Sequence, residues 1–154
     1  LNPAEAFAGI ATALDLGLGL AERGHPVSFV ATDMPLKDQS KTRGFLATRN
    51  IIADDIDLIH LHCGVVEKQI AFHAQDRFAA TAWWTAHLAH QVASKVGVTL
   101  PPYYLKQDYE PCFYPWGTEY AYARASYDLP HIPVFNVTGL NSEYINLLLP
   151  VVPF

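Results

Sequence analysis

The chain has 154 residues, of which 51% are apolar and 16% are charged, and its formal net charge is −5. This length suits one domain with a substantial core, but the charged fraction is below the roughly 25% of a typical soluble domain, which indicates a surface that meets a partner or a second domain. Nucleic acid is excluded as an expected partner, because phosphate contacts need Lys and Arg and the sequence has no basic cluster. No apolar run approaches the roughly 18 to 20 residues that span a bilayer, and the two cysteines suggest no disulfide scaffold, so we expect a cytoplasmic protein.

The first predicted element is a helix over residues 5–23. Apolar residues recur there at helical spacing, and Gly24 is a natural stop after them. Gly17 and Gly19 lie inside this helix, where each costs up to about 1 kcal/mol relative to Ala. Two glycines on a helix face are typical of close packing against a sheet, which we therefore expect.

Strands and helices alternate along the rest of the chain, with a weaker mixed signal over residues 41–53. The predicted strands cover residues 26–33, 56–64, the start of 76–95, 102–110 and 131–139, and the predicted helices cover the remainder of 76–95 and 117–129. Parallel strands need crossover connections of this kind. The pattern therefore predicts an α/β fold with a doubly wound, mostly parallel sheet, forming a single Rossmann-like lobe over residues 1–154.

Ligands of such sheets bind beyond the carboxyl ends of the strands. Asp33, Gly64, Thr81 and Asp108 follow those ends, so we expect them at one edge of the sheet. The first helix has no strand before it. The tail "INLLLPVV", residues 145–152, is either the displaced central strand or part of a C-terminal helix with an irregular end.

The segment "QDYEPCFYPWGTEY", residues 107–120, combines acids with aromatic rings. Carboxylates beside aromatic faces suit a carbohydrate, because sugar C–H groups pack on rings and hydroxyls donate to Asp and Glu. Asp108 and Glu110 are therefore candidate site residues. Glu119 falls in the first turn of the next helix, where the helix dipole favours a negative charge. The alternative is a rigid loop and a helix N-terminus that Glu119 only caps.

A second candidate stretch is "ATAWWTAHLAH", residues 80–90. Thr81 lies at a strand end and can present its hydroxyl to a ligand. Trp83 and Trp84 open the following helix and point in different directions, so we expect one in the core and assign the other, Trp84, as a stacking platform.

The sequence "HLHC", residues 60–63, raises the question of a metal site. His60 and His62 share a strand face, but no well-spaced third or fourth ligand is evident, and we expect no metal. His62, near the strand end, can face the ligand, whereas His60 is expected to be a buried histidine.

Three stretches resemble a known family. "AGIATALDLGLGLAERGHPVSFVATD" resembles the opening of glycosyltransferases with two Rossmann-like lobes, the GT-B architecture. "FAATAWWTAHLA" and "YYLKQDYEPCFYPWGTEYAYARASY" are similar to a narrower group, the rhamnosyltransferases of the WsaF type. The chain departs from the family at Ala8, where the first glycine of a loop is usual, and in its absent or displaced first strand.

The resemblance implies the N-terminal, acceptor-side lobe of a retaining rhamnosyltransferase that needs no cofactor or metal. Its donor would be dTDP-L-rhamnose, held mostly by a C-terminal lobe that the chain lacks, and its acceptor a surface polysaccharide. Without that lobe we expect no activity. Asp108 and Glu110 are the predicted catalytic residues, which orient acceptor hydroxyls or stabilise the oxocarbenium charge. The predicted substrate-binding residues are Gly9, Ile10, Thr81, Trp84, Gln107, Tyr109, Tyr114 and Glu119.

Gly9 and Ile10 are assigned to the donor phosphate, because amide N–H groups at a helix start can meet an anion. Close packing explains the glycine equally well. Besides donor, acceptor and missing lobe, the partners expected for the parent protein include the inner face of the membrane and a second copy of the chain. The alternative function is a carbohydrate- or partner-binding module without catalysis. A flavodoxin-like or response-regulator domain is disfavoured, because neither a phosphate loop nor an acidic cluster is evident near the first strand.

Overall fold

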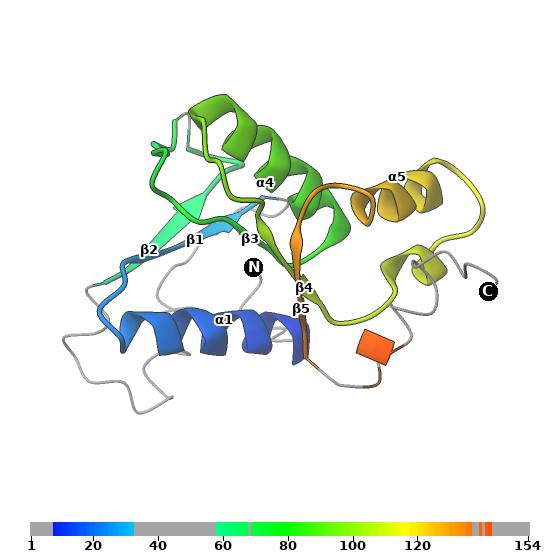
Figure 1. The fold of residues 1–154 in the computed structure, drawn as a ribbon, viewed down its shortest axis with the longest axis horizontal. Helices are drawn as coiled ribbons and strands as arrows, with labels where there is room; N and C mark the ends of the chain where they lie inside the picture. Colours follow the sequence, from blue (N-terminus) through cyan, green and yellow to red (C-terminus); the bar gives the residue numbers. More distant parts are fainter. Residues whose placement is uncertain (1–7, 33–57, 68, 137–138, 140, 143–154) are drawn as a thin grey trace, which may run out of the picture. The chain divides into compact units, whose positions relative to one another are not determined.

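The computed structural model describes residues 8–32, 58–67, 69–136, 139 and 141–142 (Figure 1). The chain divides into two compact units, Leu1–Ala71 and Phe72–Phe154. Strands alternate with helices and the described strand pairs are parallel, which confirms the predicted α/β class and is consistent with a Rossmann-like lobe. Within the described ranges no helix is long and apolar enough to cross a membrane.

The first unit contains helix α1, Ala8–Ala21, and strands β1, Val27–Ala31, and β2, Ile59–Cys63. β1 and β2 pair in parallel over their full lengths. The predicted helix and both predicted strands are therefore confirmed, each with shorter bounds than the sequence suggested.

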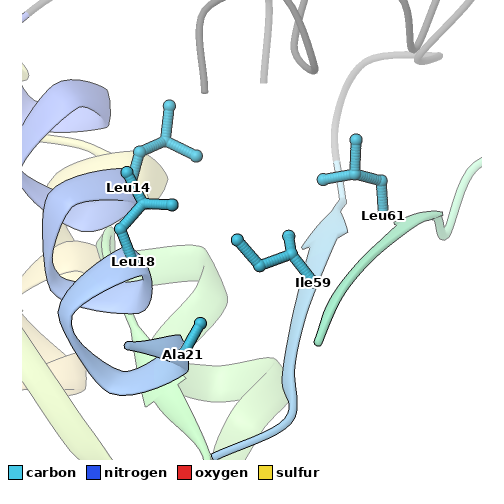
Figure 2. Close-up of a cluster of buried hydrophobic side chains, with 5 residues drawn as sticks. All are labelled: Leu14, Leu18, Ala21, Ile59 and Leu61. Atoms are coloured by element: carbon cyan, nitrogen blue, oxygen red, sulfur yellow. The ribbon is translucent and has the colours of Figure 1, made fainter. Parts of the chain in front are cut away.

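One face of α1 packs on this pair of strands. Leucine side chains on that face are removed from water, and each fully buried one contributes about 1.5 to 3 kcal/mol to folding. The buried cluster consists of Leu14, Leu18 and Ala21 from α1 and Ile59 and Leu61 from β2 (Figure 2).

Two glycines shape this helix in different ways. A Cβ atom on Gly17 would lie 2.3 Å from Cζ of Phe29 in β1, so the absence of a side chain permits the close approach of helix and strand. This confirms the predicted close packing for Gly17. Gly24 has φ of 81°, a left-handed conformation that glycine adopts without strain, and it follows the helix end as predicted.

β2 alternates between two environments along its length. Ile59, Leu61 and Cys63 are buried, whereas His60 is exposed. The prediction that His60 is a buried histidine is therefore wrong. Since successive strand residues face opposite sides, giving the core face to Ile59 and Leu61 turns His60 away from it.

The second unit holds the remaining elements. These are β3, Ala79–Ala80; α4, Trp83–Val96; β4, Tyr103–Lys106; the 3₁₀ helix η2, Glu110–Phe113; α5, Thr118–Ser126; and β5, Ile132–Phe135. The strands form a parallel sheet in the order β3-β4-β5. The predicted strand that turns directly into a helix is confirmed as β3 followed by α4.

Small residues bring α4 close to this sheet. Ala80 of β3, Ala86 of α4 and Tyr104 of β4 form a buried cluster, with Ala89 and Leu129 packed against it. α4 then ends at Gly97, which has φ of 77°. The helix therefore packs on the sheet through its alanines and ends at a left-handed glycine.

Two of the predicted strand-end residues lie at the same end of one sheet. Thr81 follows β3, and Asp108 lies just beyond β4, the strand that pairs in parallel with β3. Gly64 follows β2 in the first unit, where its N–H donates to the carbonyl of Ala31 over 2.8 Å. Asp33, the mixed segment 41–53 and the tail 145–152 lie outside the described residues, so the expectations for them stay predictions.

Candidate functional site

The loop after β4 begins with a local turn. The backbone N–H of Tyr109 donates to the Asp108 carboxylate over 2.8 Å, and the chain then enters η2. Pro111 lies in the first turn of η2, where its fixed φ suits the helix and its missing N–H costs little. The Asp108 side chain is left exposed at the carboxyl end of the sheet.

Glu110 connects this loop to the start of α4. Its Oε2 accepts the backbone N–H of Trp83 over 2.9 Å, and its Oε1 accepts the hydroxyl of Tyr104 over 2.8 Å. Burial raises the pKa of the Glu110 carboxyl, while these two hydrogen bonds and the charge of Lys106 oppose that shift. Both carboxylate oxygens therefore have protein donors, and Glu110 acts as an N-terminal cap for a helix distant in sequence.

The Tyr127 hydroxyl fixes the backbone on both sides of Tyr109. It donates to the carbonyl of Asp108 over 3.0 Å and accepts the N–H of Glu110 over 3.2 Å. The rings of Tyr109 and Tyr127 also pack edge to face with centroids 5.2 Å apart. Three consecutive loop residues are thus held by one side chain.

Lys106 is the last residue of β4 and is only 1% exposed. Its Nζ is 3.3 Å from the ring centroid of Tyr104 and 3.4 Å from that of Tyr127, so both ring faces can stabilise its ammonium form. Burial lowers the pKa of Lys106 to about 7, and the Glu110 carboxylate opposes this shift. Burial, followed by the charge of Glu110, raises the pKa of Tyr104.

Further amides at the start of α4 are capped from within the helix. Oγ1 of Thr85 accepts the backbone N–H groups of Thr81 and Ala82, both over 2.9 Å. Together with Glu110, Thr85 satisfies donors that a helix start otherwise leaves open. The exposed Thr81 side chain remains at the strand end.

Trp83 is the centre of an aromatic cluster. Its indole N–H donates to the hydroxyl of Tyr114 over 3.0 Å, and its ring stacks nearly parallel to Tyr122 at 6.5 Å. Trp84 meets Trp83 edge to face at 5.7 Å. Both tryptophans are half-buried, so the structure does not divide them into one core residue and one exposed platform.

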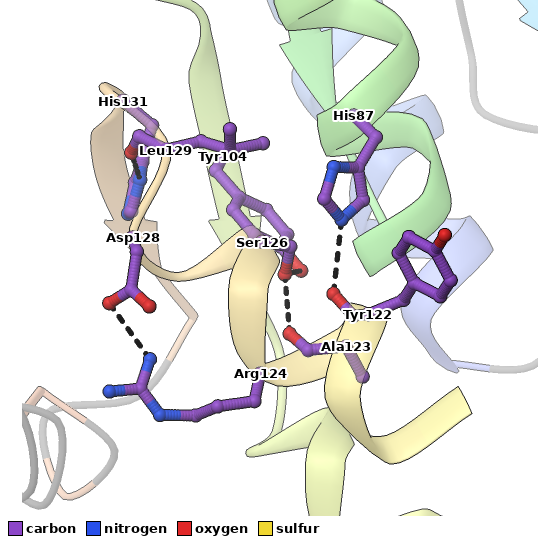
Figure 3. A network of polar contacts seen from close by, with 9 residues as sticks. All are labelled: His87, Tyr104, Tyr122, Ala123, Arg124, Ser126, Asp128, Leu129 and His131. Atoms are coloured by element: carbon purple, nitrogen blue, oxygen red, sulfur yellow. Dashed lines mark hydrogen bonds and ion pairs between the residues drawn. The ribbon is translucent and has the colours of Figure 1, made fainter. Parts of the chain in front are cut away.

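Polar contacts link α5 to α4, to β4 and to the residue Asp128 after its C-terminal end (Figure 3). Nε2 of His87 lies 3.0 Å from the carbonyl of Tyr122, which requires that this nitrogen carries the proton. Arg124 pairs with Asp128 over 2.9 Å. Ser126 donates to a carbonyl one turn earlier and lies 3.3 Å from the Tyr104 hydroxyl, which ties the helix to β4.

Other parts of the 107–120 segment face solvent. Glu119 lies in the first turn of α5, as predicted, and its side chain is exposed. Trp116 is 89% exposed and stacks on Tyr120 with centroids 4.6 Å apart. Of the other predicted binding residues, Gln107, Tyr109 and Tyr114 are half-buried. The segment therefore combines exposed carboxylates with an open aromatic ring.

The predicted phosphate-binding residues lie in the first unit. Gly9 and Ile10 belong to the first turn of α1, as the sequence indicated. The Ile10 side chain packs against the buried cluster of that unit, so only its backbone is a candidate for an anion.

A second polar cluster follows β2 in the same unit. Glu67 turns back on the strand end: its Oε1 accepts the N–H of Cys63 over 2.6 Å, and its Oε2 lies 3.0 Å from Nδ1 of His62. The hydrogen bond from Cys63, and then that from His62, lower the pKa of Glu67. This contact orients the His62 ring at a strand end, where the sequence had placed it. No group of three or more potential metal ligands occurs in the part of the chain that the structure describes.

Sequence reasoning missed three residues of the second unit: Tyr104, Lys106 and Tyr127. Tyr104 and Lys106 are two positions apart on β4, so the two-residue period of a strand places their side chains on the same face. This spacing was the signal in the sequence that could have paired Tyr104 with Lys106. Nothing in the local sequence indicated that Tyr127, at the end of α5, contacts the loop after β4.

Comparison with protein families identifies the family of the chain. A family model described as WsaF, N-terminal domain, matches residues 1–138 of the chain. No curated protein matches the sequence. The matched residues include Gly64, which follows β2, Thr81, which follows β3, and the whole segment from β4 to α5.

Proposed function

The chain belongs to the WsaF N-terminal domain family, that of WsaF-type glycosyltransferases, and on this basis we propose that it is the acceptor-side lobe of a retaining rhamnosyltransferase. The donor is dTDP-L-rhamnose and the acceptor is a surface polysaccharide. A separate C-terminal lobe completes the donor site, so this lobe alone is inactive. The enzyme acts in the cytoplasm, at the inner face of the membrane.

The observation that carries this proposal is the exposed Asp108 carboxylate beyond β4. Ligands of parallel sheets bind beyond the carboxyl ends of the strands. Asp108 belongs to the same segment as the open Trp116 ring and the exposed Glu119 carboxylate. Ring faces and carboxylates are the groups that pack on sugar C–H surfaces and accept sugar hydroxyls.

In this proposal Asp108 contacts the substrate directly. Its carboxylate accepts a hydrogen bond from a hydroxyl of the acceptor saccharide, or it faces the positive charge that develops at the transferred sugar. A catalytic role for Glu110 stays a prediction, since a substrate hydroxyl would have to share an oxygen that already accepts a hydrogen bond from Trp83 or Tyr104. The geometry supports a positioning role for Glu110 more directly.

The other predicted residues take supporting roles. The hydroxyl of Thr81 and the side chains of Gln107 and Glu119 contact the acceptor, and the aromatic cluster around Trp83 and Trp84 forms its packing surface. Tyr109 and Tyr114 hold the loop and that cluster in place. Gly9 and Ile10, in the first turn of α1, offer backbone amides to the donor phosphate.

The second candidate is a carbohydrate-binding module without catalysis. It is favoured by Trp116, whose side chain is 89% exposed, because an exposed ring can bind a sugar without taking part in any reaction. The two candidates differ in a measurable way, since only a transferase consumes the donor.

The test uses the full-length protein and a panel of nucleotide sugars that differ in base and sugar. Donor hydrolysis and transfer to a saccharide acceptor are measured, and the Asp108→Asn variant is compared with wild type. We expect dTDP-L-rhamnose to be consumed fastest and the variant to be strongly impaired. Saccharide binding without consumption of any donor would instead identify a binding module.

A further inference from the structure

The Tyr127 hydroxyl lies between the backbone groups of the two residues predicted to be catalytic. We propose that Tyr127 is the positioning residue for the Asp108 carboxylate, an inference that rests on the proposed function of Asp108. Tyr127 itself is buried, and its hydroxyl forms hydrogen bonds with the backbone on both sides of Tyr109. It therefore acts through the loop.

One hydroxyl satisfies both loop groups because it has one proton to donate and lone pairs to accept. It donates to the Asp108 carbonyl over 3.0 Å and accepts the Glu110 N–H over 3.2 Å. With the peptide groups on both sides of Tyr109 fixed, the loop cannot turn without breaking these bonds. The Asp108 side chain, which is exposed, is presented from a fixed backbone.

The Tyr127 ring is itself held from several directions. Lys106 places its Nζ 3.4 Å from the ring centroid, and the Tyr104 ring packs at 5.9 Å. The preceding residue, Ser126, lies 3.3 Å from the Tyr104 hydroxyl. Contacts with β4 and the end of α5 thus fix the position of the Tyr127 hydroxyl. The loop backbone that is bonded to this hydroxyl is fixed with it.

Small displacements of a reacting group are costly in catalysis: a shift of about 1 Å can lower the rate about 100-fold. Tyr127→Phe removes the hydroxyl and keeps the ring between Lys106 and Tyr104. Tyr103→Phe is the matched control, because Tyr103 is an exposed tyrosine of β4. In the full-length protein we expect Tyr127→Phe to lower kcat for transfer about 10-fold or more and the control to leave it unchanged, with donor KM similar in both.

A double-mutant cycle with Asp108→Asn separates positioning from a general loss of structure. If Tyr127 acts through the Asp108 carboxylate, Tyr127→Phe should change kcat less than about 2-fold in the Asp108→Asn background, because the group it positions is already gone. An equal loss in both backgrounds, or wild-type kcat in Tyr127→Phe, overturns the inference while the role of Asp108 stands. Full activity of Asp108→Asn overturns the role of Asp108 and this inference together.

Amide hydrogen exchange provides a measurement that does not depend on how well the variant folds. In the wild-type protein the Glu110 N–H should exchange at least about 10-fold more slowly than in an unstructured peptide, because it is bonded to Tyr127 in the folded state. Exchange at the rate of an unstructured peptide would show that the hydrogen bonds of the Tyr127 hydroxyl do not hold the loop, and it would overturn the proposal.

Discussion

The backbone N–H of Trp83 donates to the side chain of Glu110 over 2.9 Å, although the two residues are 27 positions apart in the sequence. The same carboxylate accepts the hydroxyl of Tyr104 from β4. A single acid therefore joins the start of α4, the strand β4 and the loop that carries Asp108. This relationship makes the charge of Glu110 and its hydrogen bonds separable by mutation.

Glu110→Gln should leave stability nearly unchanged. The amide oxygen can accept the Trp83 N–H, and the amide N–H₂ can donate to the Tyr104 hydroxyl, which is able to rotate. Glu110→Ala removes both bonds to a charged acceptor and should lower the free energy of unfolding by about 2 to 4 kcal/mol. Urea unfolding of both variants measures this, with Glu119→Ala, at an exposed carboxylate of α5, as the control. Equal loss in the Gln and Ala variants would contradict it.

The same pair of variants tests what Glu110 does in the reaction. If its charge is catalytic, Glu110→Gln should lose transfer activity although it folds normally. If Glu110 only positions the loop, Glu110→Gln should keep most of the wild-type kcat. We expect the second result, since both oxygens already accept hydrogen bonds from the protein. Steady-state kinetics on the full-length protein decides between them.

Asp108→Asn should lower kcat about 100- to 1000-fold, which corresponds to about 2.7 to 4 kcal/mol of transition-state stabilisation. The side chain is exposed and its shape is preserved, so unfolding should be unaffected. Donor KM should change little, because the carboxylate is proposed to meet charge that develops only during transfer. Near-normal turnover would leave the 107–120 segment with a structural role only.

Trp84→Ala should weaken acceptor binding and raise acceptor KM, with little change in stability. Trp83→Ala should lower stability, because its indole donates to the Tyr114 hydroxyl and contacts several rings. Thermal unfolding together with acceptor titration distinguishes the two variants. The reverse pattern would show that Trp83, not Trp84, forms the packing surface for the sugar.

Lys106 should make stability depend on pH. Its pKa falls from 10.5 to about 7 in the folded state, so its burial costs most below pH 7 and the cost is relieved as pH rises towards 10.5. Wild-type stability should therefore rise between pH 7 and 9, by at most about 1.4 kcal/mol per pH unit. The aromatic faces of Tyr104 and Tyr127 favour the ammonium form and reduce this slope. Lys106→Met should lack the slope, and the exposed Lys95→Met should keep it, in urea unfolding at each pH.

The two glycines of α1 should respond in opposite ways to alanine. Gly17→Ala places a Cβ 2.3 Å from the present position of the Phe29 ring, which must move, and we expect a loss of about 1 to 3 kcal/mol. In Gly19→Ala the nearest atom is the flexible guanidinium end of Arg23 at 3.4 Å, so the helix propensity of Ala should add up to about 1 kcal/mol. Denaturant unfolding measures both, and equal effects would contradict the close approach of α1 and β1.

The sequence by itself determined the alternation of strands and helices, the end of α1 shortly before Gly24, the strand-to-helix turn at Thr81 and the family resemblance of the 107–120 segment. These follow from short-range periodicity, from residues with special backbone preferences and from a long contiguous motif. Only the tertiary structure decided that Glu110 caps α4, that Lys106 lies between two tyrosine rings and that Tyr127 bridges Asp108 and Glu110. It also decided that His60 faces away from the core, because the strand face buried depends on which side the helix covers. Hydrogen bonds between residues 17 to 27 positions apart exist only once the strands and helices have been brought together, so no local pattern encodes them.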